Sequence, residues 1–103
     1  MSDPSKISID DYVSQIEGNL VSDMDGEKVM LNIDNGKYYN MGTVGGYIWI
    51  LMDNPIMVTK IIAQLIEEYN VEREECEKEV LAFLNHLLKE SLIYKSKQAS
   101  IQV

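Results

Sequence analysis

The first half of the chain alternates apolar and polar residues with the period of a β-strand. In the segment 27–34, Val29, Leu31 and Ile33 stand on alternate positions, which places their side chains on one face of a strand. Met30 lies on the other face, and Met41 further along favours that face as well. The pattern therefore predicts a central strand at 27–34 without deciding which of its two faces meets the core.

Two dipeptides mark the ends of this strand. Asp25-Gly26 and Asn35-Gly36 are residue pairs that tolerate the positive φ angles of a type I′ two-residue hairpin loop. We expect each to fold the chain back, so that residues 19–24 and 37–41 flank the central strand in an antiparallel meander. A sheet of three strands cannot bury a face alone, so the rest of the chain must cover it.

Beyond residue 42 the apolar spacing becomes that of a helix. A dense apolar segment predicts a first short helix at 44–52, with Thr43 as its N-cap. One apolar stripe between residues 58 and 69 predicts a second helix, and another from residue 76 to about Glu90 predicts a third and longest one. A short extended piece is expected at 91–95. The predicted fold class is α+β, with a three-stranded antiparallel sheet followed by three helices.

The length and composition predict one domain. A chain of 103 residues that is 46% hydrophobic can fill one modest core. We place the domain at 19–95, because residues 1–18 give no clear element and the polar residues 96–103 are typical of a frayed tail.

The acidic composition excludes several classes of partner. Seventeen acidic and nine basic side chains give a formal charge of −8, which repels nucleic-acid phosphates and anionic membrane surfaces. The longest apolar stretch, 47–52, is far shorter than the ~20 residues of a membrane span. Residues 1–6 lack the apolar run of a secretory signal, and a single cysteine cannot form an internal disulfide, so we expect a cytoplasmic location.

No set of side chains indicates catalysis. Cys76 and His86, the chain's one cysteine and one histidine, lie about 15 Å apart along one predicted helix and cannot form a thiol–imidazole pair. They cannot supply a zinc-ligand set either. The glycine-rich segment 42–46 lacks the Gly-Lys-Ser/Thr ending of a phosphate loop. We therefore expect no enzyme activity, no cofactor and no metal.

Several pieces of the sequence, in their order and spacing, resemble the PqqD family of peptide-recognition domains. These pieces are Gly36-Lys37-Tyr38-Tyr39-Asn40-Met41, Gly45-Gly46-Tyr47-Ile48-Trp49-Ile50-Leu51, Asn54-Pro55, Tyr69-Asn70-Val71, Val80-Leu81-Ala82-Phe83-Leu84 and Leu87-Leu88-Lys89-Glu90-Ser91-Leu92-Ile93. The resemblance covers residues 19–95, and the free-standing forms of lasso-peptide pathways look most similar. At Met57 the chain departs from the family, which often has a Thr or Ser helix cap there.

The resemblance implies a function and a fold. It implies a winged helix-turn-helix domain, a RiPP recognition element, that binds the leader segment of a ribosomally synthesised precursor peptide. In a lasso-peptide pathway it implies that such a domain presents the leader to a leader peptidase and a cyclase. It further implies that the leader carries aromatic and proline anchors, in the lasso case a tyrosine and a proline a few residues apart.

The expected hairpin register suggests how a leader would bind. If both loops have two residues, Asp34 pairs with Lys37, and Tyr39 bonds inward to Asn32. Alternate residues then turn their backbone groups to the open edge of the sheet, where an extended peptide can add as a further strand. The candidate leader-binding residues are Lys37, Tyr38, Tyr39, Asn40 and Met41 on the strand and Cys76, Glu79, Val80 and Phe83 on the third helix.

Two other functions stay open. The same fold could act as an adaptor to a radical enzyme of quinone-cofactor biosynthesis. Alternatively, the glutamates at the start of the third helix could hold a basic partner protein, although carboxylates there also stabilise the helix dipole. DNA binding is excluded, because a winged helix reads DNA with a basic helix, whereas here five glutamates oppose Arg73 and Lys78, a balance of 2 − 5 = −3.

Overall fold

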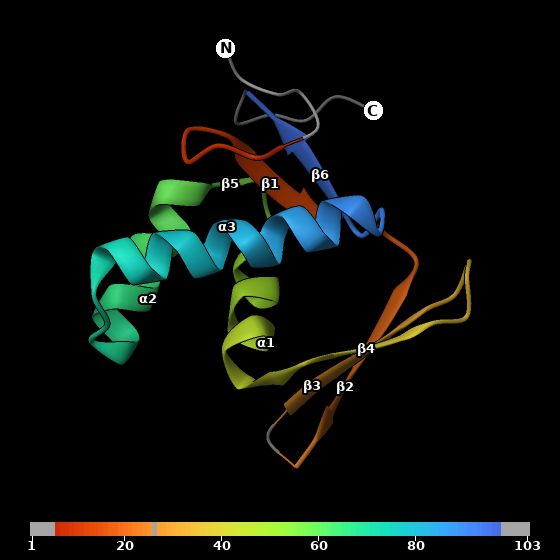
Figure 1. Ribbon diagram of the computed structural model, residues 1–103. Coiled ribbons are helices and arrows are strands. Elements are labelled where there is room, and N and C mark those ends of the chain that lie inside the picture. The colour runs from red at the N-terminus through yellow and green to blue at the C-terminus, as the bar shows by residue number, and fades with distance from the viewer. Residues whose placement is uncertain (1–5, 26, 98–103) are drawn as a thin grey trace.

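The computed structural model describes residues 6–25 and 27–97, and in this part of the chain three helices pack with two small antiparallel sheets. The predicted α+β class is confirmed, and Figure 1 shows the arrangement. The elements are β1 Tyr12–Gln15, β2 Asn19–Met24, β3 Glu27–Asn32, β4 Tyr38–Met41, α1 Gly42–Leu51, β5 Ile56–Met57, α2 Val58–Tyr69, α3 Arg73–Lys89 and β6 Ile93–Ser96.

The predicted meander is present as a sheet of strand order β2-β3-β4. Its first hairpin has the expected register, with Met24 paired to Glu27. Asp25, in the loop, has a φ of 54°, as the first position of a type I′ turn requires.

The second hairpin differs from the prediction. Leu31 pairs with Tyr38, and the backbone N–H of Asn32 donates to the carbonyl of Lys37 at 3.0 Å, so Asp34 does not pair with Lys37. Residues 33–36 form a longer loop because the carbonyl of Asn32 accepts the N–H of Gly36 at 2.8 Å, and Gly36 has a φ of 71°. Tyr39 therefore lies opposite Met30 rather than Asn32. The register has moved by two residues, and an even shift keeps every side chain on its expected face.

The helices meet the even-numbered face of β3. Met30 is fully buried there and Met41 is buried beside it, whereas Ile33 on the odd face is 59% exposed. The sequence places apolar side chains on both faces of β3, and packing against α1 buries only the even-numbered face. Leu20 and Tyr38, which flank Leu31, lie on the outer face and are exposed.

Strand β4 runs directly into α1. The helix begins at Gly42, so Met41 occupies the N-cap position and the predicted cap at Thr43 is wrong. Gly42 has a φ of 69° and pairs with Lys28 one residue out of register, which turns the chain from strand to helix. Gly46 lets α1 lie close to β3, because a Cβ atom there would stand 2.7 Å from the Cβ of Lys28.

Helix α2 has the predicted bounds, and its first N–H groups are capped by the N-terminal segment. The N-cap residue Met57 makes no side-chain cap. Instead, the carbonyls of Asp11 and Ile9 accept the N–H groups of Val58 at 2.9 Å and Thr59 at 3.2 Å. These tertiary bonds satisfy two of the donors that a Ser or Thr cap would otherwise serve.

A second sheet, not expected from the sequence, has the strand order β5-β1-β6. Its central strand β1 comes from the segment 1–18, and Val13 in this strand is fully buried. The extended piece expected at 91–95 is the strand β6. The predicted tail at 96–103 is described only at Ser96 and Lys97, and the rest lies outside the described residues.

One core joins the helices to both sheets. It contains buried apolar side chains from α1, α2, α3, β1 and β3, among them Trp49, Ile61, Ile62 and Leu84. None of the helices in the described ranges is long and apolar enough to cross a membrane.

Asp11 is a fully buried carboxylate at the edge of this core. Its Oδ2 atom accepts the N–H of Ser8 at 2.8 Å, and its Oδ1 atom lies 2.6 Å from Nζ of Lys97. Burial opposes the negative charge, but these hydrogen bonds and the charges of Lys97 and Lys95 outweigh it and hold the pKa of Asp11 below its ordinary value of 3.8. The ionised carboxylate thus stabilises the segment that caps α2.

We expect Asp11→Asn to lower the free energy of unfolding at neutral pH by about 1 kcal/mol or more, because the ion pair with Lys97 is lost. Since the folded-state pKa is lowered, the stabilisation is complete above an ordinary pKa of 3.8 and is lost as the pH falls through the folded-state value. Urea unfolding at neutral pH and near pH ~3 measures both effects. A difference between wild type and variant that stays the same at both pH values would contradict this account.

Candidate functional site

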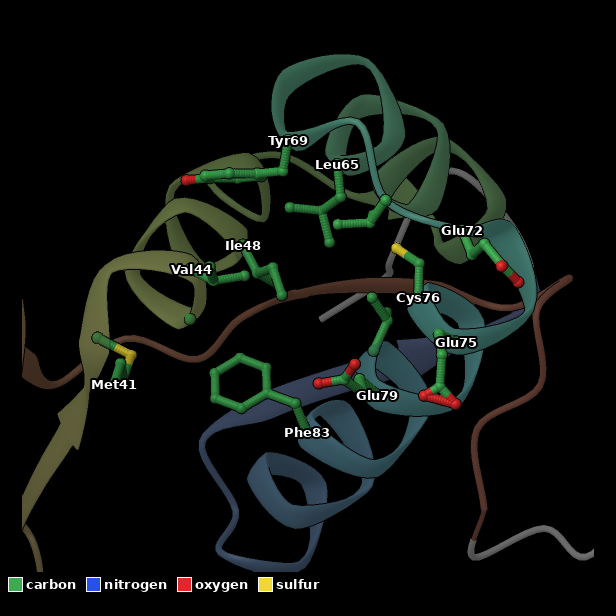
Figure 2. A pocket seen from close by; sticks show the side chains of 13 residues that line it. Met41, Val44, Ile48, Leu65, Tyr69, Glu72, Glu75, Cys76, Glu79 and Phe83 are labelled. Carbon is green, nitrogen blue, oxygen red and sulfur yellow. The ribbon is translucent and has the colours of Figure 1, made fainter.

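A groove of about 760 Å³ opens where β4 ends, between α1, the C-terminal end of α2 and the first half of α3 (Figure 2). It is lined by Met41, Val44, Gly45, Ile48, Leu65, Tyr69, Val71, Glu72, Glu75, Cys76, Glu79, Val80 and Phe83. Most of these side chains are apolar, and the groove opens to solvent. Its shape and lining suit apolar side chains of a bound chain.

The groove brings together five of the nine candidate residues. Met41 supplies the end of β4, and the candidates Cys76, Glu79, Val80 and Phe83 form the α3 wall. The other four candidates, residues 37–40, do not line the groove. They form or precede the strand that leads into it.

Within residues 6–25 and 27–97, no strand pairs with the outer edge of β4. Asn32 bonds to Lys37, and bonded residues alternate along an antiparallel pair, so Tyr39 bonds inward to β3. Tyr38 and Asn40 consequently turn their backbone N–H and C=O groups away from β3. Because β4 is the last strand of its sheet, these groups face the open edge.

The side chain of Tyr39 ties this strand to α3. Its hydroxyl donates to Oε1 of Glu90 at 2.9 Å, and Nζ of Lys37 lies 3.6 Å from the same oxygen. The hydrogen bond from Tyr39, followed by the charge of Lys37, holds the pKa of Glu90 below its ordinary value. Tyr39 and Lys37 therefore position β4 beside the end of α3, while Tyr38 on the opposite face is 73% exposed.

Phe83, on the α3 wall of the groove, packs against α1. A Cβ atom added at Gly45 would lie 3.0 Å from Cζ of Phe83 and 3.3 Å from the Cβ of Met41. The glycine thus gives the Phe83 ring its place against α1. Figure 2 shows this ring between Met41 and Glu79.

Cys76 is a buried residue of the groove wall. Burial and the charge of Glu79 raise the pKa of its thiol, and Arg73 lowers it by less. The sulfur lies 4.0 Å from the carbonyl of Ile62. A thiol that stays protonated is a poor nucleophile.

Eight groove residues were not among the candidates, and a sequence signal existed for some of them. Glu72 and Glu75 continue the face of Cys76, Glu79 and Phe83 by one turn at steps of three and four, so helical periodicity alone could have found them. The α1 residues could not be found this way, because α1 is apolar on all sides and its sequence does not indicate which side faces the groove. Leu65, Tyr69 and Val71 join the groove through the packing of α2 on α3.

In residues 6–25 and 27–97, no group of three or more His, Cys, Asp or Glu side chains is arranged to hold a metal ion.

Known proteins share this sequence pattern and fold. The family model described as "Coenzyme PQQ synthesis protein D (PqqD)" matches residues 27–93, which is 67 of the 103 residues. No curated protein matches the chain.

Two solved structures are similar to the chain. The one described as "TbiB1 in Complex with the TbiA(beta) Leader Peptide" is 26% identical, with a TM-score of 0.70, over 78% of this chain and 93% of that one. The one described as "Lasso peptide synthetase B1 complexed with the leader peptide" has the same fold, with a TM-score of 0.70 at 20% identity over 80% of this chain and 96% of that one.

The family match and the similarity to the two leader-peptide complexes support a PqqD-like RiPP recognition element. The chain belongs to the PqqD family.

The environment of Cys76 gives a prediction about the groove. We expect Glu79→Gln to lower the pKa of the thiol, because it removes a charge that disfavours the thiolate. The rate of Cys76 alkylation at mildly alkaline pH should rise accordingly. Glu77→Gln on the same helix is the control, since Glu77 does not line the groove. Equal rates for Glu79→Gln and wild type would show that this carboxylate does not act on the groove.

Proposed function

We propose that the protein is a non-catalytic recognition domain that binds the leader segment of a ribosomally synthesised precursor peptide by strand addition to the outer edge of β4. The observation that carries the proposal is the continuity of edge and groove. Tyr38 and Asn40 offer backbone groups at the edge, and Met41, the last residue of the same strand, lines the groove. Backbone bonds would give affinity to an extended peptide, and the groove would select its side chains.

The geometry favours β4 over the other free edge of the sheet. Strand β2 is also an edge strand, but the groove residues of the sheet come only from the end of β4. The Tyr39–Glu90 hydrogen bond further holds β4 in place, which reduces the ordering cost of binding.

The two similar structures support this assignment, because each is described as a complex with a leader peptide. Aromatic and proline side chains of the leader, a tyrosine and a proline in a lasso pathway, would occupy the apolar groove. The domain would present the bound leader to the processing enzymes, a leader peptidase and a cyclase. We place this activity in the cytoplasm, where precursor peptides are made.

The name of the matching family favours one second candidate. The description of the family model names coenzyme PQQ synthesis. The protein could therefore use the same strand edge as an adaptor to a radical enzyme of quinone-cofactor biosynthesis. Co-purification with a radical enzyme encoded by a neighbouring gene, rather than with a leader peptidase, would favour this second function. The other alternative, in which the glutamates at the start of α3 hold a basic partner protein, predicts instead that this partner binds without contacting the edge of β4.

Proline substitutions at the open edge test strand addition. Tyr38→Pro and Asn40→Pro each remove an outward N–H that the sheet does not use, and edge strands tolerate proline. We expect each variant to keep its fold and to bind the leader peptide of the neighbouring precursor gene more weakly, by about 1 kcal/mol or about fivefold in Kd. Isothermal titration measures Kd, and thermal unfolding reports the fold.

Three control variants make the result specific. Val21→Pro places the same change at an outward position of β2 and should leave binding unchanged. Asn40→Ala accounts for the hydrogen bond that Oδ1 of Asn40 accepts from the N–H of Gly42 at 3.0 Å. Tyr39→Pro removes an inward bond and should lower the melting temperature. If folded Tyr38→Pro and Asn40→Pro bind as tightly as wild type, the edge of β4 is not the docking site.

A further inference from the structure

The two ends of the groove differ in chemical character. Near β4 the lining is apolar, with Met41, Val44 and Phe83. Glu72, Glu75 and Glu79 also line the groove, and Figure 2 shows Glu72 and Glu75 on the side away from Met41 and Glu79 beside Phe83. No lysine or arginine is among the lining residues.

These three carboxylates are exposed, and none forms a salt bridge in the described part of the chain. The charge of Glu79 acts inside the groove, because burial and then Glu79 raise the pKa of the Cys76 thiol, and Arg73 lowers it by less. An apolar groove with three negative charges along one wall attracts cations.

Helix stability does not account for all three. The helix dipole favours carboxylates in the first turn, where Glu74 and Glu75 lie. Glu79 lies beyond that turn but still faces the groove. Lys78 does not line the groove, so the groove-facing positions of α3 before Val80 are acidic or apolar.

We propose that Glu72, Glu75 and Glu79 determine the specificity of the groove, selecting leaders that carry a lysine or arginine beside the apolar anchor. This inference rests on the proposed function. The leader would lie along β4, place its apolar anchor against Phe83 and Met41, and direct the cationic side chain toward the three carboxylates. Charge complementarity at such a rim acts on specificity and association rate more than on total affinity.

The test uses a matched pair of double variants. Glu75→Gln/Glu79→Gln removes two charges that line the groove, and Glu74→Gln/Glu77→Gln removes two charges of the same helix that do not. Both variants change the net charge equally, so any difference between them comes from position. Random linear peptides presented by mRNA display are selected separately against wild type and each variant.

We expect wild type and Glu74→Gln/Glu77→Gln to enrich peptides with a lysine or arginine at a fixed spacing from an aromatic or proline residue. Glu75→Gln/Glu79→Gln should lose that basic preference while keeping the anchor. A wild-type-selected peptide should bind this variant about two- to fivefold more weakly per charge removed, with a smaller dependence of Kd on salt.

The outcomes separate this inference from the proposed function. Suppose that the selected peptides bind Asn40→Pro more weakly than wild type, and so depend on the edge of β4. If they then show no preference for lysine or arginine, or if peptides selected against Glu75→Gln/Glu79→Gln show the same preference, the charge selection is wrong and the proposed function stands. If selected peptides bind Asn40→Pro and Tyr38→Pro as tightly as wild type, or no peptide is selected, the proposed function fails and the inference fails with it.

Discussion

The unpaired edge of β4 is the constraint on which the rest of the structure depends. Backbone N–H and C=O groups are obligatory hydrogen-bonding groups, and on this edge only water or an added strand can satisfy them. The protein keeps the strand in place although one side is open. It does so through β3 on the inner edge and through the hydrogen bond from Tyr39 to Glu90 at the end of α3.

The same hydrogen bond connects the sheet to the helical wall of the groove. Glu90 is the C-cap residue of the helix that carries Cys76, Val80 and Phe83, so this bond links the edge strand to the helix that forms one wall of the groove. On the other wall, two adjacent glycines set the position of α1: Gly46 allows contact with β3 and Gly45 gives room to Phe83. A larger residue at either position would displace one of these contacts, so the groove depends on the small size of both.

The N-terminal segment stabilises the helical part of the molecule from outside the matched family region. It supplies the carbonyls that cap α2, it places β1 between β5 and β6, and Ile7 donates its N–H to Oδ1 of Asn85 on α3 at 2.8 Å. The buried Asp11 holds this segment through Ser8 and Lys97. This role was not predictable from the sequence, because backbone carbonyls have no residue signature, and β1 and β5 have only four and two residues, too few to show a clear alternation.

The sequence by itself determined the local elements, because hydrophobic periodicity and turn chemistry act over a few residues. The meander, the bounds of α2, the first hairpin register and the α3 wall of the groove were all predictable in this way. Tertiary structure decided the rest. The buried face of β3 depended on its packing against α1, and the α1 wall of the groove depended on which side of a uniformly apolar helix met Phe83. In each case the local sequence is compatible with two arrangements of nearly equal local free energy, and only contacts between residues distant in the sequence decide between them.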